Sequence, residues 1–434
     1  MKLAFSGGIH PAGHKELTNN AVPVEAKAPE IVAIPLKQHI GAPCTALVEK
    51  GAHVYMGQKI GDGEGMTVPV HASVSGEVIA VEPRKFPGWG DVECIVIKND
   101  FKDEFKSDLK AHDSADSLNG DEILRIIREA GIVGMGGAAF PTNIKAKVPL
   151  GDIDTVIANA CECEPYITSD DMLLRTNPEK VLGGLKLIAE ILRPKRIVIA
   201  VEDNKKEAID VLRGELKNYP MIELSVLPTR YPQGAEKQLI YAVTKREVPS
   251  GKLPKDIGCG VFNTATCASV YEAVIEGMPV IRRIVTITGE GANEPKNMIV
   301  RFGTSYEDAL NAAGGIKPET EKVLSGGPMM GLAQPDLKSS VVKGNNAILC
   351  LLPQKKYDET ACIRCGKCTE VCPIRLQPLY LYRNVKNGNT EGLKKLGIMD
   401  CIECGCCAYG CPAKLPLTES FRLGKKAVRE AMAK

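Results

Sequence analysis

The chain lacks histidine beyond residue 112, because all six histidines of its 434 residues lie before that point. Hydrolases that use a Ser-His-Asp triad, and metal sites ligated by imidazole, are therefore disfavoured in the rest of the chain. Reactions that a bound cofactor carries are compatible with this composition, since the protein then supplies binding and orientation.

Long apolar runs and a strong net charge are also missing. No stretch approaches the roughly 18 apolar residues of a helix that spans a bilayer. Residues 1–6 precede two glycines rather than an apolar segment, so we expect no signal peptide. The net charge of +2 disfavours a nucleic-acid partner. We expect a chain that reaches a membrane only through partner proteins.

Cysteine, by contrast, is plentiful, and eight of the 16 cysteines form two motifs near the C-terminus. Each motif reads C-x₂-C-x₂-C-x₃-C followed by proline, a spacing typical of 4Fe–4S clusters. In two-cluster ferredoxins the fourth cysteine of each motif ligates the other cluster. We therefore predict a first cluster on Cys362, Cys365, Cys368 and Cys411. We predict a second cluster on Cys401, Cys404, Cys407 and Cys372.

Zinc and disulfides are the alternative interpretations of these motifs. Zinc ribbons use paired C-x₂-C rather than a triple, and disulfides would leave the duplicated spacing without a reason. Cys406 stands beside Cys407 and is either a buried spare thiol or a competing ligand. The other cysteines are scattered in mostly apolar surroundings, which suits a reducing compartment.

The first quarter of the chain predicts an extended segment followed by β structure. Residues 1–40 are rich in Pro, Gly and His, and residues 41–98 alternate short apolar stretches with glycine turns. The latter resemble the barrel-sandwich hybrid of biotinyl and lipoyl domains. No lysine lies in the matching turn at residues 70–73, so we expect a structural relative rather than a carrier. Residues 99–119 predict a linker.

Residues 121–230 alternate between helical and strand patterns, as in a parallel sheet with helices on its faces. This Rossmann-like part lacks the G-x-G-x-x-G dinucleotide fingerprint. Residues 284–350 return to β character and resemble the ligand-binding β-grasp (SLBB) domain, and residues 418–434 predict a basic helix. The fold class is thus multidomain α/β. The expected parts are 1–40, 41–119 with the hybrid, 120–283 with the Rossmann-like sheet, 284–353 with the SLBB-like module and a ferredoxin-like 354–434.

Two stretches of the Rossmann-like part are candidates for cofactor binding. The glycine-rich loop at residues 131–142 can bring backbone N–H groups close to an anion, and Lys145 adds a positive charge. Close packing of helix against sheet would explain the same glycines. Asn159, Glu162 and Glu164 follow a predicted strand, at the edge where parallel sheets bind ligands. A polar turn is the alternative there.

Together these motifs resemble a known family. Gly-x-Gly-Gly-Ala-x-Phe-Pro-Thr at 134–142, Asn-Ala-x-Glu-x-Glu-Pro at 159–165, and the loop with Tyr231, Gly234 and Glu236 occur in the flavoprotein that oxidises NADH in respiratory complex I. The early Gly-Gly-Ile-His-Pro block, the hybrid and the two cysteine motifs make the chain more similar to the C subunits of Rnf complexes. Those complexes are ferredoxin–NAD oxidoreductases that pump ions.

The resemblance implies FMN over the Rossmann-like domain, with NAD(H) against the flavin ring. Lys252 is a further candidate for the nicotinamide site. The positions that match the FMN site are Gly134, Gly136, Gly137, Lys145, Asn159, Glu162, Tyr231, Asn263 and Thr266. The positions that match the nicotinamide site are Phe140, Glu164 and Glu236, of which Glu164 and Glu236 are the catalytic candidates.

The sequence also departs from the complex I flavoprotein. Met135 stands in place of an arginine, Ala139 of a glycine, Cys161 of an aspartate and Phe262 of an asparagine. We therefore expect different contacts to the FMN phosphate. Two clusters replace one, which fits a chain that exchanges electrons with a separate partner.

The expected function is that of an NADH/FMN/iron–sulfur subunit of an Rnf-type ferredoxin:NAD⁺ oxidoreductase. Its partners would be other membrane and iron–sulfur subunits, with ferredoxin indirectly, at the cytoplasmic face of the membrane. The acidic Glu162 and Glu164 favour NADH by repelling a 2′-phosphate. Two alternatives are a cobalamin reductase of a diol-utilisation microcompartment and an electron-relay subunit without flavin.

Overall fold

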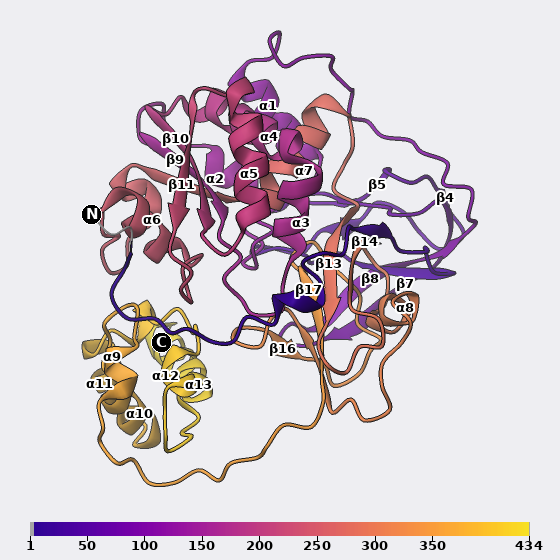
Figure 1. Cartoon of the computed structure of the whole chain (residues 1–434). Helices are drawn as coiled ribbons and strands as arrows, with labels where there is room; N and C mark the ends of the chain where they lie inside the picture. Colours follow the sequence, from indigo (N-terminus) through magenta and orange to yellow (C-terminus); the bar gives the residue numbers. More distant parts are fainter. Residues whose placement is uncertain (1–3, 434) are drawn as a thin grey trace.

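The computed structural model describes residues 4–433, which form three β-rich parts and a helical C-terminal part (Figure 1). Among these residues, every helix is too short or too polar to span a bilayer.

The Rossmann-like part is built on a four-stranded parallel sheet, as predicted. Alternate residues face opposite sides: Val156 and Ile199 join one hydrophobic cluster, whereas Ile157 and Val198 join another. Helices α1, α4, α5 and α7 cover the first face and α6 covers the second. The strands, in sheet order, are β11 (Ile222–Leu227), β10 (Arg196–Glu202), β9 (Thr155–Ala160) and β12 (Cys259–Asn263). The helices are α1 (Gly120–Glu129), α2 (Thr142–Ala146), α3 (Ser169–Thr176), α4 (Pro178–Leu192), α5 (Lys206–Glu215), α6 (Glu236–Thr244) and α7 (Thr264–Ile275).

Two small sheets of the hybrid enclose one hydrophobic cluster that includes Ile34, Ile60 and Ile95. Residues 31–35, which we expected in an extended segment, form a strand here because their apolar side chains fill this core. One sheet has the order β2 (Ile31–Pro35), β8 (Gly90–Asn99), β7 (Gly76–Phe86) and β4 (His53–Val54). The other has the order β3 (Thr45–Ala46), β5 (Lys59–Asp62) and β6 (Val70–His71).

The turn that would carry a cofactor in a biotinyl or lipoyl domain is buried. Ser73 is fully buried, and its hydroxyl donates to the carbonyl of Phe302 at 2.5 Å. A swinging cofactor arm requires an exposed tip, so this geometry matches a structural domain.

A six-stranded sheet forms the SLBB-like module, and its edge strand comes from the N-terminal segment. Val24 pairs with Met298 and Glu25 with Ile299, in parallel. The sheet order is β1 (Val24–Glu25), β14 (Lys296–Arg301), β13 (Arg282–Thr288), β17 (Ala347–Leu351), β15 (Lys322–Ser325) and β16 (Leu332–Ala333), with α8 (Tyr306–Ala312) beside it.

The C-terminal part is a small helical domain reached through residues 352–366, which have no regular structure. Its core gathers Leu381, Leu393, Ile398 and Phe421. The helices are α9 (Lys367–Glu370), α10 (Pro378–Lys386), α11 (Thr390–Lys395), α12 (Cys406–Tyr409) and α13 (Leu417–Ala433).

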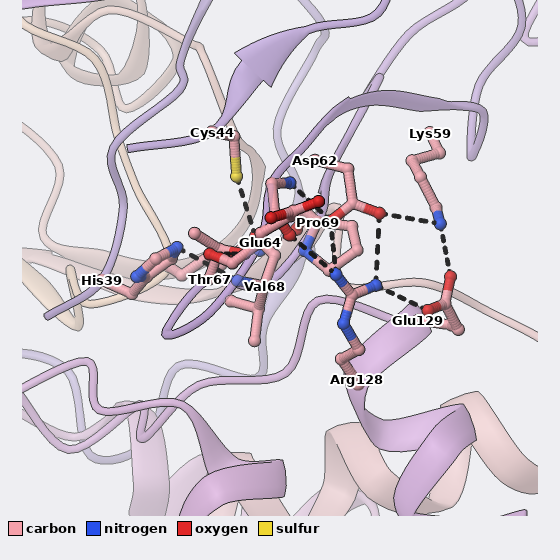
Figure 2. Close-up of polar contacts among 12 residues, drawn as sticks. His39, Cys44, Lys59, Asp62, Glu64, Thr67, Val68, Pro69, Arg128 and Glu129 are labelled. Carbon is pink, nitrogen blue, oxygen red and sulfur yellow. Dashed lines mark hydrogen bonds and ion pairs between the residues drawn. The ribbon is translucent and has the colours of Figure 1, made fainter. Parts of the chain in front are cut away.

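A network of charged side chains joins the hybrid to the Rossmann-like part, as Figure 2 shows. The guanidinium of Arg128, at the end of α1, donates to Asp62 at 2.7 Å and to Glu129 at 2.6 Å. Lys59 of β5 bonds to both carboxylates. These four half-buried charges hold the hybrid beside the helix that leads into the glycine-rich loop.

Candidate functional site

Two asparagines end adjacent parallel strands and mark the carboxyl edge of the Rossmann-like sheet. Asn159 of β9 and Asn263 of β12 are partners in register. The Asn159 amide donates to the carbonyl of Gly234 at 2.8 Å, which ties β9 to the loop before α6. The Asn263 oxygen caps α7 by accepting from the Ala265 N–H at 2.9 Å.

The glycine-rich loop lies against the same edge. The Met135 N–H donates to the hydroxyl of Thr266 at 2.9 Å, so the first turn of α7 holds the loop in place. A Cβ at Gly136 would lie 3.3 Å from Asn263, and Gly137 has a φ of +124° that disfavours side chains. Residues 136–138 are exposed. Bare backbone thus faces the solvent beside the strand ends, which is a cradle that a flavin phosphate or ring fits.

Lys145, predicted to contact FMN, and Glu236, predicted to contact the nicotinamide dinucleotide, form an ion pair with each other. The Lys145 ammonium donates to the Glu236 carboxylate at 2.7 Å and lies 5.5 Å from the centre of the Phe262 ring. Glu236 is the first residue of α6 and is partly exposed. A bound anion would compete with Glu236 for Lys145.

Glu162 is buried and its carboxylate is fully engaged by the protein. It accepts from the Asp170 N–H at 2.6 Å, from the Ser169 hydroxyl at 3.4 Å and from the Lys205 ammonium at 3.0 Å. Its exposed side-chain fraction is 2%. This geometry suits a residue that shapes the site rather than one that faces a ligand.

Glu164 faces a different neighbourhood, between the SLBB-like module and the cysteine motifs. Its carboxylate accepts from the Met329 N–H at 3.1 Å and from the Tyr231 hydroxyl at 3.5 Å. Burial raises the pKa of Glu164 to about 7, against the hydrogen bonds that lower it. The Tyr231 hydroxyl also lies 2.8 Å from the carbonyl oxygen of Cys404. Tyr231 therefore connects the candidate flavin site with the second cysteine motif.

Phe140 lies in the glycine-rich loop, where its carbonyl accepts from the Gly134 N–H at 2.8 Å. Lys252 lies in a turn closed by a bond from its N–H to the Pro249 carbonyl at 3.1 Å. Neither contact tests their predicted roles.

Several residues of the site carry no recognisable motif in the sequence. Lys205 pairs with Glu162, and the buried Arg283 donates to the Met135 carbonyl at 3.1 Å. Lys15 contacts the loop that holds Glu162 and Glu164. Both amide atoms of Gln233 are buried without a hydrogen-bond partner among residues 4–433, in the same loop as Tyr231. A buried charge or orphaned amide is recognisable only when its distant neighbours are known.

The two cysteine motifs have the same backbone conformation. Arg364 and Glu403, at equivalent positions, both have a φ of +57°, and Gly366 and Gly405 both have a φ of +79°. These left-handed residues turn the chain so that backbone N–H groups face sulfur. The Arg364 N–H donates to the sulfur of Cys362 at 3.4 Å, and the Glu403 N–H to that of Cys401 at 3.4 Å.

One apolar cavity is lined by Cys372 of the first motif together with three cysteines of the second motif, Cys401, Cys404 and Cys407. These are the four residues that we predicted for the second cluster. Cys406 lines the same cavity and is fully buried. No three His, Cys, Asp or Glu side chains within residues 4–433 converge on one point as ligands of a single metal ion would.

The other four predicted ligands are more open to solvent. Cys362 and Cys365 are exposed, whereas Cys368 and Cys411 lie in one hydrophobic cluster. The Thr360 N–H donates to the Ala413 carbonyl at 3.1 Å, which brings the start of the first motif to the end of the second. The donor set of each group, four cysteines on two duplicated turns, suits a 4Fe–4S cluster.

Four family models match successive parts of the chain. The match is to the RnfC barrel sandwich hybrid domain at residues 3–102 and to the Nuo51 FMN-binding domain at residues 127–272. It continues with the SLBB domain at residues 284–333 and the 4Fe-4S dicluster domain at residues 354–412. These matches confirm the predicted fold class and the FMN and 4Fe–4S cofactors.

Among solved structures, an NAD⁺-reducing [NiFe]-hydrogenase in the air-oxidized state is similar in fold, with a TM-score of 0.52 and 18% identity. The likeness covers 73% of this chain and 61% of the hydrogenase chain.

Full-length relatives are closer in sequence. The C subunit of the Na⁺-translocating ferredoxin:NAD⁺ oxidoreductase complex of Acetobacterium woodii is 44% identical, over 98% of this chain and 97% of the relative. The C subunit of the proton-translocating complex of Clostridium ljungdahlii is 43% identical, over 88% of this chain and 84% of the relative. The chain therefore belongs to the family of C subunits of Rnf ion-translocating ferredoxin:NAD⁺ oxidoreductase complexes.

Proposed function

We propose that this protein exchanges electrons between NAD(H) and a partner subunit of an ion-translocating ferredoxin:NAD⁺ oxidoreductase. When bound, FMN supplies hydride exchange with the nicotinamide and single-electron exchange with the clusters. The observation that carries the proposal is a chain of contacts from the glycine-rich loop to the second cysteine motif. The glycine-rich loop lies against the ends of β9 and β12. Asn159 of β9 holds the loop of Tyr231 through Gly234, and Tyr231 contacts Cys404.

The glycine-rich loop and the strand ends would hold FMN. The backbone N–H groups of the exposed Gly136 and Gly137 would face its phosphate, with Lys145 released from Glu236 to add a positive charge. Asn159 and Asn263 would orient the flavin ring at the strand ends. Glu162 would stabilise its own loop through its bond to the Asp170 N–H, and Thr266 would stabilise the glycine-rich loop through its bond to the Met135 N–H.

Glu164 and Glu236 would contact the nicotinamide dinucleotide, together with Phe140. A carboxylate accepts hydrogen bonds from a ribose hydroxyl or a carboxamide, so these residues would bind and orient the nucleotide. The negative charge of Glu236, and that of Glu164 above its pKa, would also repel the 2′-phosphate of NADPH. The raised pKa of Glu164 makes this contact sensitive to pH near neutrality.

The clusters would act in a fixed order. The cluster of Cys401, Cys404, Cys407 and Cys372 would be proximal to the flavin, because Tyr231 links its loop to the candidate site. The cluster of Cys362, Cys365, Cys368 and Cys411 would be distal, because two of its ligands are exposed. Electrons would enter or leave the chain through the distal cluster.

The chain would act within an assembly at the cytoplasmic face of a membrane, bound to membrane and iron–sulfur subunits. Relatives from Acetobacterium woodii and Clostridium ljungdahlii are named as subunits of complexes that translocate Na⁺ and protons. These names favour the Rnf-type role over a cobalamin reductase. Net flow would run from reduced ferredoxin to NAD⁺, coupled elsewhere in the complex to ion transport.

An anaerobic titration of the reconstituted full chain with NADH tests the proposal. Bleaching of a flavin absorbance band, with appearance of reduced 4Fe–4S signals in electron paramagnetic resonance (EPR), would support the whole path. Clusters that respond to dithionite in a chain that binds no flavin would contradict it and indicate a relay subunit.

A further inference from the structure

The N-terminal segment crosses three other parts of the molecule, and we call residues 5–25 the N-terminal strap. Figure 1 shows it in indigo, running past the helical C-terminal domain toward β14 and β17. The Gly8 N–H donates at 2.9 Å to the carbonyl of Val371, which precedes Cys372 in the first cysteine motif. Ile9 and Tyr231 exchange backbone hydrogen bonds of 2.8 and 3.0 Å. The strap thus contacts the chain next to Cys372, a predicted ligand of the proximal cluster, and the loop of Tyr231.

The side chain of Lys15, in the strap, contacts the loop at residues 162–167. Its ammonium donates to the carbonyls of Glu162 at 2.9 Å, Glu164 at 2.9 Å and Ile167 at 2.5 Å. An ammonium has three N–H donors, so all of them are used on this loop. The stem of Lys15 is partly exposed, whereas its ammonium is enclosed, and burial lowers its pKa to about 8.

The loop needs such support because of its backbone conformation. Glu162 and Tyr166 both lie in the left-handed region, with φ values of +44° and +70°. Non-glycine residues persist there only where the surroundings hold them. The strap supplies further contacts at the end of the loop: the Tyr166 N–H donates to the Gly13 carbonyl at 2.7 Å.

Lys15 and Lys205 contact different atoms of this loop. Lys205 binds the side chain of Glu162, within the Rossmann-like part. Lys15 binds only main-chain oxygens, and one of them belongs to Glu164. A shift of the Glu164 carbonyl would carry its carboxylate away from Met329 and Tyr231, which fix it from the other side.

We propose that Lys15 is a positioning residue for the nucleotide, because its ammonium holds the loop that presents Glu164. The inference rests on the proposed function, in which Glu164 contacts NADH. It adds that the strap, distant in sequence, sets the geometry of the nucleotide site while leaving the FMN cradle and the cluster ligands in place.

The test compares Lys15→Met, Lys15→Gln and Lys15→Arg in the full chain, reconstituted with FMN and iron–sulfur clusters. Lys27→Met is the matched control, since Lys27 is an exposed lysine shortly after the strap. Flavin bleaching is followed over a range of NADH concentrations without oxygen. Flavin and iron content, reduction by dithionite and the melting temperature are measured on the same samples.

For Lys15→Met we expect the NADH concentration for half-maximal rate to rise about tenfold, with a smaller change in the limiting rate. Flavin content, iron content and dithionite reduction should match the wild type. Lys15→Gln keeps two N–H donors, so its NADH concentration for half-maximal rate should lie between those of the wild type and Lys15→Met. Lys15→Arg should have nearly the affinity of the wild type for NADH.

Unchanged NADH affinity in Lys15→Met would overturn the inference, as would a loss of flavin in parallel with the loss of affinity. If neither Lys15→Met nor Lys15→Gln folds, Lys15 is a requirement of the fold and the inference is wrong. A wild-type chain without flavin, or without a response to NADH, would instead refute the proposed function and the inference with it.

Discussion

The two cysteine motifs share their spacing and their backbone turns, yet they lie in different environments. The second motif lines an apolar cavity and contacts Tyr231, whereas Cys362 and Cys365 of the first motif are exposed. The shared spacing therefore produces the same backbone turns but not the same surroundings. Reduction potentials of iron–sulfur clusters depend on exposure and hydrogen bonding to sulfur. Because one motif is exposed and the other is buried, we expect the two proposed clusters to differ in reduction potential.

The sharpest test of this comparison removes one ligand from each motif. In Cys404→Ala, we expect the proximal cluster to be lost and the distal cluster to remain but no longer to be reduced by NADH. In Cys365→Ala, the distal cluster should be lost while NADH still reduces the proximal one. EPR after NADH, with dithionite as reference, separates the two results. Tyr231 contacts the main chain of Cys404, so alanine preserves that bond.

The crossed ligation is tested by the fourth cysteine of each motif. Cys372→Ala should remove the cluster held by the second motif, and Cys411→Ala should remove the cluster held by the first. Iron content should fall from about eight to about four atoms per chain in each variant. Cys406→Ala should keep both clusters. Loss of the first motif's cluster in Cys372→Ala would mean that each motif serves its own cluster.

Glu164, whose charge acts on Cys404 of the second motif, is a carboxyl with a pKa close to neutral. Because burial raises the pKa of Glu164 from 4.5 to about 7, the folded protein retains a proton that the unfolded chain releases between these values. Stability therefore falls as pH rises through this interval. Glu164→Gln should raise the free energy of unfolding by about 3 kcal/mol at pH 8, and should leave it almost unchanged at pH 4.

The same variant should weaken reduction of the flavin by NADH, which separates its effects on stability and function. Denaturant unfolding at the two pH values and NADH titration measure them. Glu236→Gln is the control for stability, since the side chain of Glu236 is 42% exposed. A Glu164→Gln variant with equal stability changes at both pH values would contradict the assigned pKa.

The smallest expected effect is on the rate of cluster loss. Under oxygen and a chelator, the signal of the exposed first cluster should decay several-fold faster than that of the second, because solvent reaches Cys362 and Cys365. Time-resolved EPR of the wild-type chain follows both. Equal decay rates would show that the two environments do not differ in access.

Much of the fold was predictable from local patterns. The parallel sheet followed from apolar runs such as residues 155–160 and 196–201, because both faces of such strands are buried. The N-terminal segment was not predictable in this way. Residues 24–25 form a strand only because β14 offers a free edge 274 residues later.

The candidate site was predictable where it rests on motifs and not where it rests on distant contacts. Gly136, Asn159 and Asn263 are recognisable by their place after strands and before helices. Lys15 lies 149 residues from Glu164, and nothing in its neighbourhood marks it. Glu162 belongs to the motif at residues 159–165, but the sequence did not indicate that its carboxylate points inward and binds Lys205.

The sequence by itself determined the cysteine spacing, the duplicated turns and the alternation of helix and strand, since these depend on neighbours within a few residues. Only the tertiary structure decided which cysteine motif is buried, which carboxylate is desolvated and which lysine holds the loop at residues 162–167. Burial and electrostatics depend on groups brought together from distant parts of the chain, so local sequence carries no record of them.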